Sequence, residues 1–263
     1  MKLRDKTVVI TGAGGGIGAA MAVRFAREKP RGIVVSDIDA HAVADVAAQV
    51  RELGVAALQH RADVGDQRQV AELVAASERE FGRIDVLCSN AGIAVGMGVH
   101  APAERWSAAW SVNVMAHVHL ARAVLPAMAA RGSGYIMITA SAAGLLGLPG
   151  DAPYSVTKTA AVGLAEWLAA TYRRSGVTVS ALCPLGVRTG LLMRALTAGH
   201  PAARAVADFG PILDADEVAD VALEGIADER FLILPHPDVA QLYAKKAADP
   251  EGWLTELQRE GRR

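Results

Sequence analysis

The stretch Thr7–Gly18, TVVITGAGGGIG, places a short apolar strand directly before a glycine-rich turn. An apolar pattern through Met21 and Phe25 then predicts a helix that ends before Pro30. Strand, glycine turn and helix in this order are the context that a dinucleotide-binding fingerprint requires. The glycines permit a sharp turn and a close approach to a pyrophosphate, which the helix N-terminus stabilises. We therefore expect a cofactor loop made of Gly12, Gly14, Gly15, Gly16, Ile17 and Gly18.

The next predicted strand, residues 32–36, ends at Asp37. A carboxylate at this place accepts hydrogen bonds from the adenosine ribose hydroxyls and repels a 2′-phosphate. No lysine or arginine stands among residues 13–15 or directly beside Asp37 in the sequence to bind that phosphate. The sequence therefore predicts NAD as the cofactor, with NADP disfavoured. Without the glycine turn, Asp37 would be an ordinary residue at a strand end.

Strands and helices continue to alternate along the rest of the chain. This alternation predicts a Rossmann-type, doubly wound parallel α/β sheet of about seven strands with helices on both faces. No low-complexity linker divides the chain, so we expect one domain over residues 1–263. Ligands of such sheets bind at the carboxyl ends of the strands. The residues expected at those ends are Asp63, Val64, Asn90, Ala91, Gly92, Ser141 and Pro184.

Two polar side chains share one face of the helix expected over residues 153–173. Tyr154 and Lys158 are four residues apart, so they project side by side. A cation beside a phenol favours the phenolate and is expected to lower the tyrosine pKa, which makes Tyr154 a candidate general acid/base. Such a pair also occurs by chance on surface helices. Asn113, on the apolar helix expected over residues 103–130, is either a core asparagine bonded to backbone or an active-site group.

Composition narrows the possible partners. The net charge is −1 with dispersed basic residues, and no apolar run approaches the ~20 residues that span a bilayer. The two cysteines, Cys88 and Cys183, lack metal-ligand spacing and are expected to be small buried side chains. We therefore expect a cytoplasmic protein without a metal, nucleic-acid or membrane partner.

Taken together, these motifs resemble the short-chain dehydrogenase/reductase family, in its compact single-domain branch. The glycine turn and Asn90-Ala91-Gly92 are similar to two of its motifs, with Ser89 where a first asparagine is common. The resemblance implies a catalytic tetrad of Asn113, Ser141, Tyr154 and Lys158, in which tyrosine exchanges a proton with the substrate oxygen. It implies that serine orients the substrate, that lysine binds the nicotinamide ribose, and that asparagine holds a water. It also implies cofactor contacts from Pro184, Val187 and Thr189, and a homo-oligomer, tetramer or dimer.

One position departs from the family pattern, because Leu185 replaces the usual glycine after Pro184 and puts the local backbone geometry in doubt. The segments expected around the substrate, residues 93–100, 142–151 and 185–211, are largely apolar, which suits a hydrophobic secondary alcohol or ketone. Their apolar members are Val95, Met97, Leu145, Leu146, Leu148, Leu185, Leu191, Leu192, Met193 and Phe209. Residues 190–212 are expected to form a lid, and residues 236–263 a helical tail on the subunit or its neighbour. His100, His200 and Asp151 are expected to be exposed loop residues, or else substrate contacts. The alternatives are a 3-oxoacyl-thioester reductase and a non-catalytic nicotinamide redox sensor.

Overall fold

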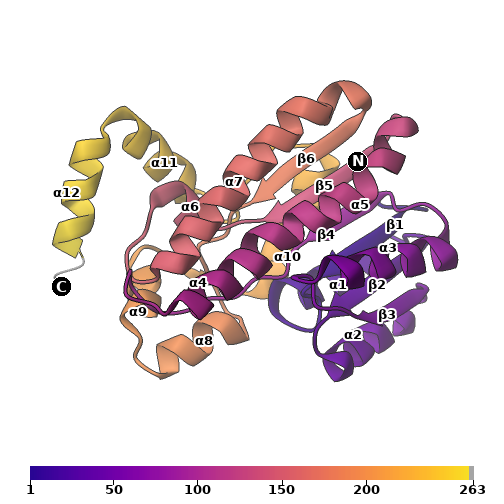
Figure 1. The fold of residues 1–263 in the computed structure, drawn as a ribbon, viewed down its shortest axis with the longest axis horizontal. Helices are drawn as coiled ribbons and strands as arrows, with labels where there is room; N and C mark the ends of the chain where they lie inside the picture. Colours follow the sequence, from indigo (N-terminus) through magenta and orange to yellow (C-terminus); the bar gives the residue numbers. More distant parts are fainter. Residues whose placement is uncertain (261–263) are drawn as a thin grey trace.

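The computed structural model describes residues 1–260, and its centre is a parallel sheet of seven strands (Figure 1). The strand order β3-β2-β1-β4-β5-β6-β9 reverses direction between β1 and β4, which confirms the predicted doubly wound sheet. Predicted boundaries hold within about two residues. The strands are β1 (Thr7–Thr11), β2 (Gly32–Asp37), β3 (Ala57–Arg61), β4 (Val86–Ser89), β5 (Gly134–Thr139), β6 (Val177–Leu182) and β9 (Leu232–Ile233).

Helices cover both faces of the sheet because its strands are apolar on both sides. Along β1, Val8 and Ile10 pack into one core and Val9 into the other, as the two-residue period of a strand requires. The first core is covered by α1 (Gly16–Ala26), α2 (Ala40–Glu52) and α10 (Ala215–Ala227). The second is covered by α3 (Gln67–Phe81), α5 (Ala116–Ala130) and α7 (Ala152–Tyr172).

The helix predicted over residues 103–130 contains a π-turn. Helix α4 (Ala103–Trp110) passes into a π-helix at Ser111–Met115 and then into α5. The Ala116 N–H bonds to the Ser111 carbonyl five residues back, rather than four. Asn113 lies inside this turn and is completely buried.

Shorter elements gather beyond the carboxyl ends of β5, β6 and β9. Two of them, β7 and β8, form a separate two-stranded parallel sheet. Elsewhere, helix α7 ends in a 3₁₀ turn at Arg173–Ser175. The elements of this region are α6 (Ala142–Leu146), β7 (Gly186–Val187), α8 (Gly190–Thr197), α9 (Pro201–Asp208), β8 (Ile212–Leu213), α11 (Asp238–Ala248) and α12 (Pro250–Glu260).

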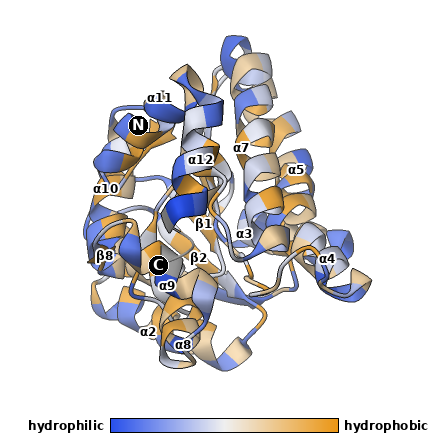
Figure 2. Cartoon of the chain, turned by 90° about the vertical axis from the view of Figure 1, so that its left-hand side faces the viewer, coloured by the Kyte–Doolittle hydropathy of each residue, from blue (hydrophilic) through white to orange (hydrophobic). Residues whose placement is uncertain are grey.

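The two C-terminal helices pack against the rest of the chain through Trp253. Its side chain is 2% exposed, and its indole N–H donates to the Leu146 carbonyl over 2.9 Å. Its ring centre lies 6.3 Å from that of Phe209, and Lys246 Nζ donates to the Leu145 carbonyl. Figure 2 shows α12 on the same side of the molecule as α8 and α9. The tail therefore covers the end of α6 and contacts the segment that follows α9.

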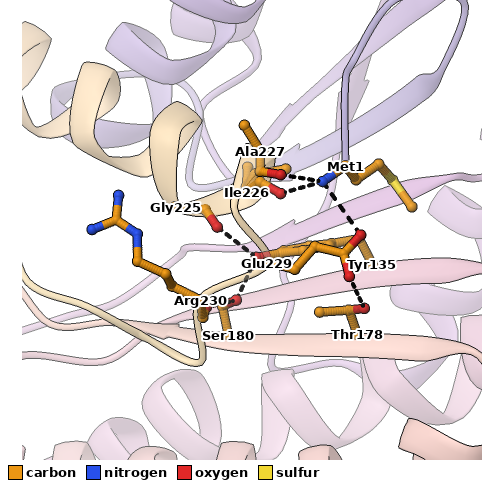
Figure 3. Close-up of polar contacts among 9 residues, drawn as sticks. All are labelled: Met1, Tyr135, Thr178, Ser180, Gly225, Ile226, Ala227, Glu229 and Arg230. Carbon is orange, nitrogen blue, oxygen red and sulfur yellow. Dashed lines mark hydrogen bonds and ion pairs between the residues drawn. The ribbon is translucent and has the colours of Figure 1, made fainter.

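Polar contacts join the end of α10 and the turn that follows it to β5 and β6 (Figure 3). The Tyr135 hydroxyl, near the start of β5, bonds to Ser180 on β6 and donates to the Gly225 carbonyl. The Met1 ammonium donates to the Ile226 and Ala227 carbonyls at the end of α10, where a helix favours positive charge. Within residues 1–260, no helix has the length and apolar character needed to cross a bilayer.

Candidate active site

The glycine turn packs so tightly that some of its positions have no room for a side chain. Gly12 has φ +62°, and a Cβ there would lie 2.6 Å from Ala91 Cα. A Cβ on Gly18 would lie 2.2 Å from the Gly12 carbonyl oxygen and 2.7 Å from Asn90 Nδ2. A Cβ on Gly15 would meet nothing within 4 Å. The turn therefore presses against β4 on one side and leaves open space before α1 on the other, which suits a pyrophosphate.

Asp37 lies beside the glycine turn, as the sequence predicts. Its Oδ2 accepts the Gly14 N–H over 3.0 Å, and its Oδ1 accepts the Asp39 N–H over 3.2 Å. The local sequence does not reveal Arg61, which is the register partner of Asp37 on β3. Its Nε donates to the Ile38 carbonyl over 3.1 Å. An arginine thus lies on the strand next to Asp37, which only the parallel pairing of β2 with β3 could have predicted.

The residues that follow β3 and β4 have different roles: some lie at the predicted site, and others stabilise the structure around it. Asn90 donates through its amide to the Thr11 and Gly12 carbonyls, so it holds β4 to the glycine turn. Asp63 accepts the Gly65 N–H, while Val64 is a buried core residue. A Cβ on Gly92 would lie 3.2 Å from Lys158 Nζ and 3.3 Å from Asn113 Oδ1, so Gly92 lies against two members of the predicted tetrad.

Ser141, Tyr154 and Lys158 meet at the carboxyl end of β5. Ser141 begins α6 as its N-cap: its Oγ accepts the Ala143 N–H over 3.1 Å and donates to the Pro184 carbonyl over 3.4 Å, and it lines one cavity with Tyr154. Lys158 is 2% exposed, and its Nζ donates to the Thr139 carbonyl over 2.8 Å. The same Nζ lies 5.7 Å from the centre of the Tyr154 ring. Residues from two segments of the chain therefore form one polar cluster.

The expectation that Lys158 lowers the pKa of Tyr154 is wrong for the protein alone. Burial raises the pKa of the Tyr154 phenol above its ordinary value and outweighs the hydrogen bond with Ser141, which acts in the opposite direction. Burial also lowers the pKa of Lys158 to about 8. The lysine lies over the ring and bonds to the Thr139 carbonyl, so its charge is not directed at the phenolic oxygen.

The Asn113 side chain bonds entirely to the protein. Its Oδ1 accepts the Ile93 N–H, and its Nδ2 donates to the Ile93 carbonyl, both over 2.9 Å. A third bond runs from Nδ2 to Thr157 Oγ1 on α7 over 3.0 Å. These bonds are those of the backbone-bonded alternative, while Gly92 lies against both Asn113 and Lys158, so the role of Asn113 in the site stays a prediction.

A buried pair that the sequence did not suggest lies close by. His117, one turn after Asn113, is 1% exposed and bonds through Nδ1 to Ser89 Oγ over 2.6 Å. Burial, aided by the charge of Lys158, lowers the pKa of His117 to about 3. Ser89 stands where the family commonly has asparagine. This difference is the one feature of the sequence that could have indicated a changed hydrogen-bond partner at position 89.

Leu185 does not force an unusual backbone, so the doubt raised by its replacement of glycine is resolved. Its φ is not positive, and its N–H donates to His236 Nδ1 over 3.2 Å. His236 Nε2 lies 3.1 Å from both the Gly186 and Pro211 carbonyls. Burial lowers the pKa of His236, which keeps Nδ1 available as an acceptor. A histidine at the start of the tail thus holds the loop after β6 and the segment just before β8 together.

A cavity of about 150 Å³ adjoins Ser141 and Tyr154. Of the apolar residues expected to frame the substrate, Leu148, Leu185, Leu191 and Leu192 line it. Leu145 and Leu146 belong to the core, and Phe209 packs on Trp253. The expectation of exposed loop residues is wrong for Asp151, which is 7% exposed, and His200 is half-buried. Both line the cavity, as do Ile17, Pro184, Val187 and Thr189.

No group of three or more metal-ligating side chains occurs in the described part of the chain. The family model described as "short chain dehydrogenase" matches residues 6–198, and this chain therefore belongs to the short-chain dehydrogenase/reductase family. It is an oxidoreductase that acts on CH–OH groups and binds a nicotinamide cofactor.

Individual relatives agree on the class and differ in cofactor. The chain is 34% identical to 17-beta-hydroxysteroid dehydrogenase 13 of Rattus norvegicus, over 87% of this chain and 74% of that protein. A Burkholderia phymatum family member in complex with NAD has 33% identity and a TM-score of 0.87, covering 95% and 96% of the two chains. A Sphingobium yanoikuyae short-chain dehydrogenase in complex with NADPH has 32% identity and a TM-score of 0.80, covering 95% of each.

Proposed function

We propose that this protein interconverts a hydrophobic secondary alcohol and its ketone with NAD, using Tyr154 as the general acid/base. The observation that carries the proposal is the meeting of Tyr154, Ser141 and Lys158 beside an apolar cavity. The cofactor supplies a nicotinamide carbon that accepts or donates the hydride. The glycine turn, Asp37, Asn90 and the loop from Pro184 to Thr189 would hold it.

In the proposed reaction, Ser141 donates a hydrogen bond to the substrate oxygen and orients it toward the phenol. Tyr154 then takes a proton from the alcohol or returns one to the ketone. Because burial raises the pKa of Tyr154 in the protein alone, the phenolate needs positive charge that is present only in the loaded site. Lys158 supplies part of that charge once its ammonium turns from the Thr139 carbonyl toward bound cofactor.

The first test is NADH formation across a panel of secondary alcohols by the wild type and by Tyr154→Phe. We expect the variant to lose about 100-fold or more in turnover, as the loss of a general acid/base does, while it still binds NADH. Tyr172→Phe, at the far end of the same helix, is the matched control. Retention of turnover by Tyr154→Phe would contradict the assigned role. NADH binding without turnover of any substrate would favour a redox sensor instead.

The cavity supports the proposal of a small substrate. Its lining is mostly apolar, and a volume of about 150 Å³ is below the ~300 Å³ at which drug-sized ligand sites begin. Because residues expected to contact the cofactor share this lining, the space left suits a small alcohol, whereas a steroid, named in the rat relative, requires displacement of the lid. The panel should therefore contain one-ring alcohols as well as hydroxysteroids, with KM measured for each.

We also propose a homo-oligomer in the cytoplasm. Trp110 on α4 is 44% exposed, and Val156 and Trp167 on α7 are 48% and 59% exposed. Large apolar side chains on two contacting helices favour contact with a second copy. Sedimentation of the wild type should show a dimer or tetramer, and Trp167→Glu should shift it toward the monomer. A monomeric wild type would contradict this part of the proposal.

A further inference from the structure

Asp151 joins two segments that lie far apart in the sequence. Its Oδ1 accepts the Tyr154 N–H in the first turn of α7 over 2.9 Å. Its Oδ2 accepts the N–H groups of Val95 and Gly96 over 2.8 and 2.6 Å. Next to it, the Ala152 N–H donates to the Met97 carbonyl over 2.9 Å. One buried carboxylate therefore fixes both the start of the helix that carries Tyr154 and the loop of residues 93–100.

The lid reaches the same loop from the other side. His200, between α8 and α9, accepts the Ala202 N–H at Nδ1, so its Nε2 carries the proton. That Nε2 lies 2.6 Å from the Gly96 carbonyl and donates to it. Gly96 has φ +70°, and a Cβ there would lie 3.0 Å from His200 Nε2. The left-handed conformation of this glycine thus presents its N–H to Asp151 and its carbonyl to His200.

We propose that Asp151 is a positioning residue that couples closure of the lid to placement of Tyr154. The link runs from His200 through Gly96 and Asp151 to the first turn of α7. A lid that closes on the substrate then also fixes the loop, the carboxylate and the helix start. The inference rests on the proposed function, because it assigns the positioning of the proposed acid/base. Asp151 positions Tyr154 through the backbone of α7 and takes no part in the proton transfer, although its negative charge also helps to raise the pKa of the phenol.

The chemistry of the link requires a carboxylate. Both oxygens of Asp151 accept hydrogen bonds from N–H donors, in different directions. Asparagine has nearly the same shape but only one accepting oxygen, and its NH₂ would face an N–H group on the other side. Asp151→Asn can therefore bond to the loop or to α7, but not to both. A buried N–H without an acceptor weakens the contact by an amount comparable to a full hydrogen bond.

Hydrogen–deuterium exchange of the full chain tests the link without turnover. We expect Asp151→Asn to speed exchange about tenfold at residues 93–100 and at the start of α7, the effect of losing one buried hydrogen bond. His200→Leu should speed exchange at both places too, although the bond from His200 to this loop goes to Gly96 and not to α7. His100→Leu, an exposed change in the same loop, is the matched control. Confinement of the His200→Leu effect to the lid would overturn the proposal.

Kinetics with NAD and the best alcohol of the panel supply the second arm. Asp151→Asn should lower kcat and raise KM, each about tenfold, whereas His200→Leu should mainly raise KM. His200→Gln, whose amide can still donate to Gly96, should recover most of the loss. The double variant should lose less than the product of the two single losses, because they break one link. Fully multiplicative losses would contradict the coupling. A wild type that binds NADH but turns nothing over contradicts the proposed function alone, since the exchange arm still stands.

Discussion

The cofactor half of the chain, residues 7–92, and the substrate half, residues 141–260, differ in the contacts that their sites depend on most. In the first, the absent side chains of Gly12 and Gly18 let β1, β4 and α1 approach closely, and the Asn90 amide adds bonds to the same turn. The second depends on polar side chains that bond to distant backbone groups, such as Asp151 to Gly96 and His236 to Leu185. We therefore expect a larger side chain at a glycine to disrupt the cofactor half. We expect the removal of a side chain to weaken packing in the substrate half.

The largest effect is expected where an atom is added to the tightest contact. Gly18→Ala places a Cβ 2.2 Å from the Gly12 carbonyl oxygen, so the turn must move. We expect a loss of about 3 kcal/mol or more in unfolding free energy and no measurable NADH binding. Gly15→Ala is the control, because its Cβ meets open space and its φ of −173° suits any residue. This control should leave chemical denaturation nearly unchanged; equal destabilisation by both variants would contradict the role of close packing.

The corresponding test in the substrate half removes a buried side chain, in the variant Trp253→Ala. Loss of the buried ring and its bond to the Leu146 carbonyl should weaken docking of the tail by about 3 kcal/mol. We expect limited proteolysis to cut residues 236–260 faster, while the sheet unfolds at nearly the wild-type denaturant concentration. Leu254→Ala changes the neighbouring residue, which is 58% exposed, and should have no effect. An unchanged cleavage rate in Trp253→Ala would show that the tail does not depend on this contact.

An intermediate effect is expected from His117, whose depressed pKa makes stability depend on pH. The folded protein keeps this histidine neutral down to about pH 3, whereas the unfolded chain protonates it below 6.5. The contribution of the neutral imidazole to the free energy of unfolding is therefore complete above pH 6.5. Below that pH, it falls by about 1.4 kcal/mol for each pH unit. Urea unfolding of His117→Gln should show a shallower loss between pH 6.5 and 5 than the wild type. Parallel curves for the two proteins would contradict the burial of a neutral imidazole.

The smallest expected effect concerns the cofactor half, where specificity does depend on a side chain. Asp37→Ser removes the carboxylate beside Arg61 and should raise kcat/KM with NADP by about tenfold. Adding Arg61→Ser should reverse that gain, because the guanidinium is then no longer available to a 2′-phosphate. A gain that survives the second change would exclude Arg61 as the phosphate partner.

The two halves also differ in how much the sequence could predict. The doubly wound parallel sheet and the cofactor turn follow from strand–helix alternation and the glycine spacing, both of which are local patterns. The sequence shows Asp151, His200 and His236 but not what they bind. Their partners lie tens of residues away and are backbone groups, which no residue type identifies. Arg61 was missed for the same reason, since only strand pairing brings it to Asp37. The pKa of Tyr154 was misjudged because i, i+4 spacing gives a shared face without giving the depth of burial.

The π-turn at Ser111–Met115 has a consequence for how the length of this segment can vary. It stores one more residue than an α-helix of the same rise, so a single deletion there can be absorbed by a regular helix. The helical turns on either side would keep their relative faces, whereas the same deletion in a regular α-helix would rotate one side by about 100°. Trp106 and Trp110 would therefore stay in place relative to His117 and Leu120. Relatives that align without a gap through residues 103–130 should share both the turn and its buried asparagine, and a relative with a regular helix here should lack one residue near 111–115.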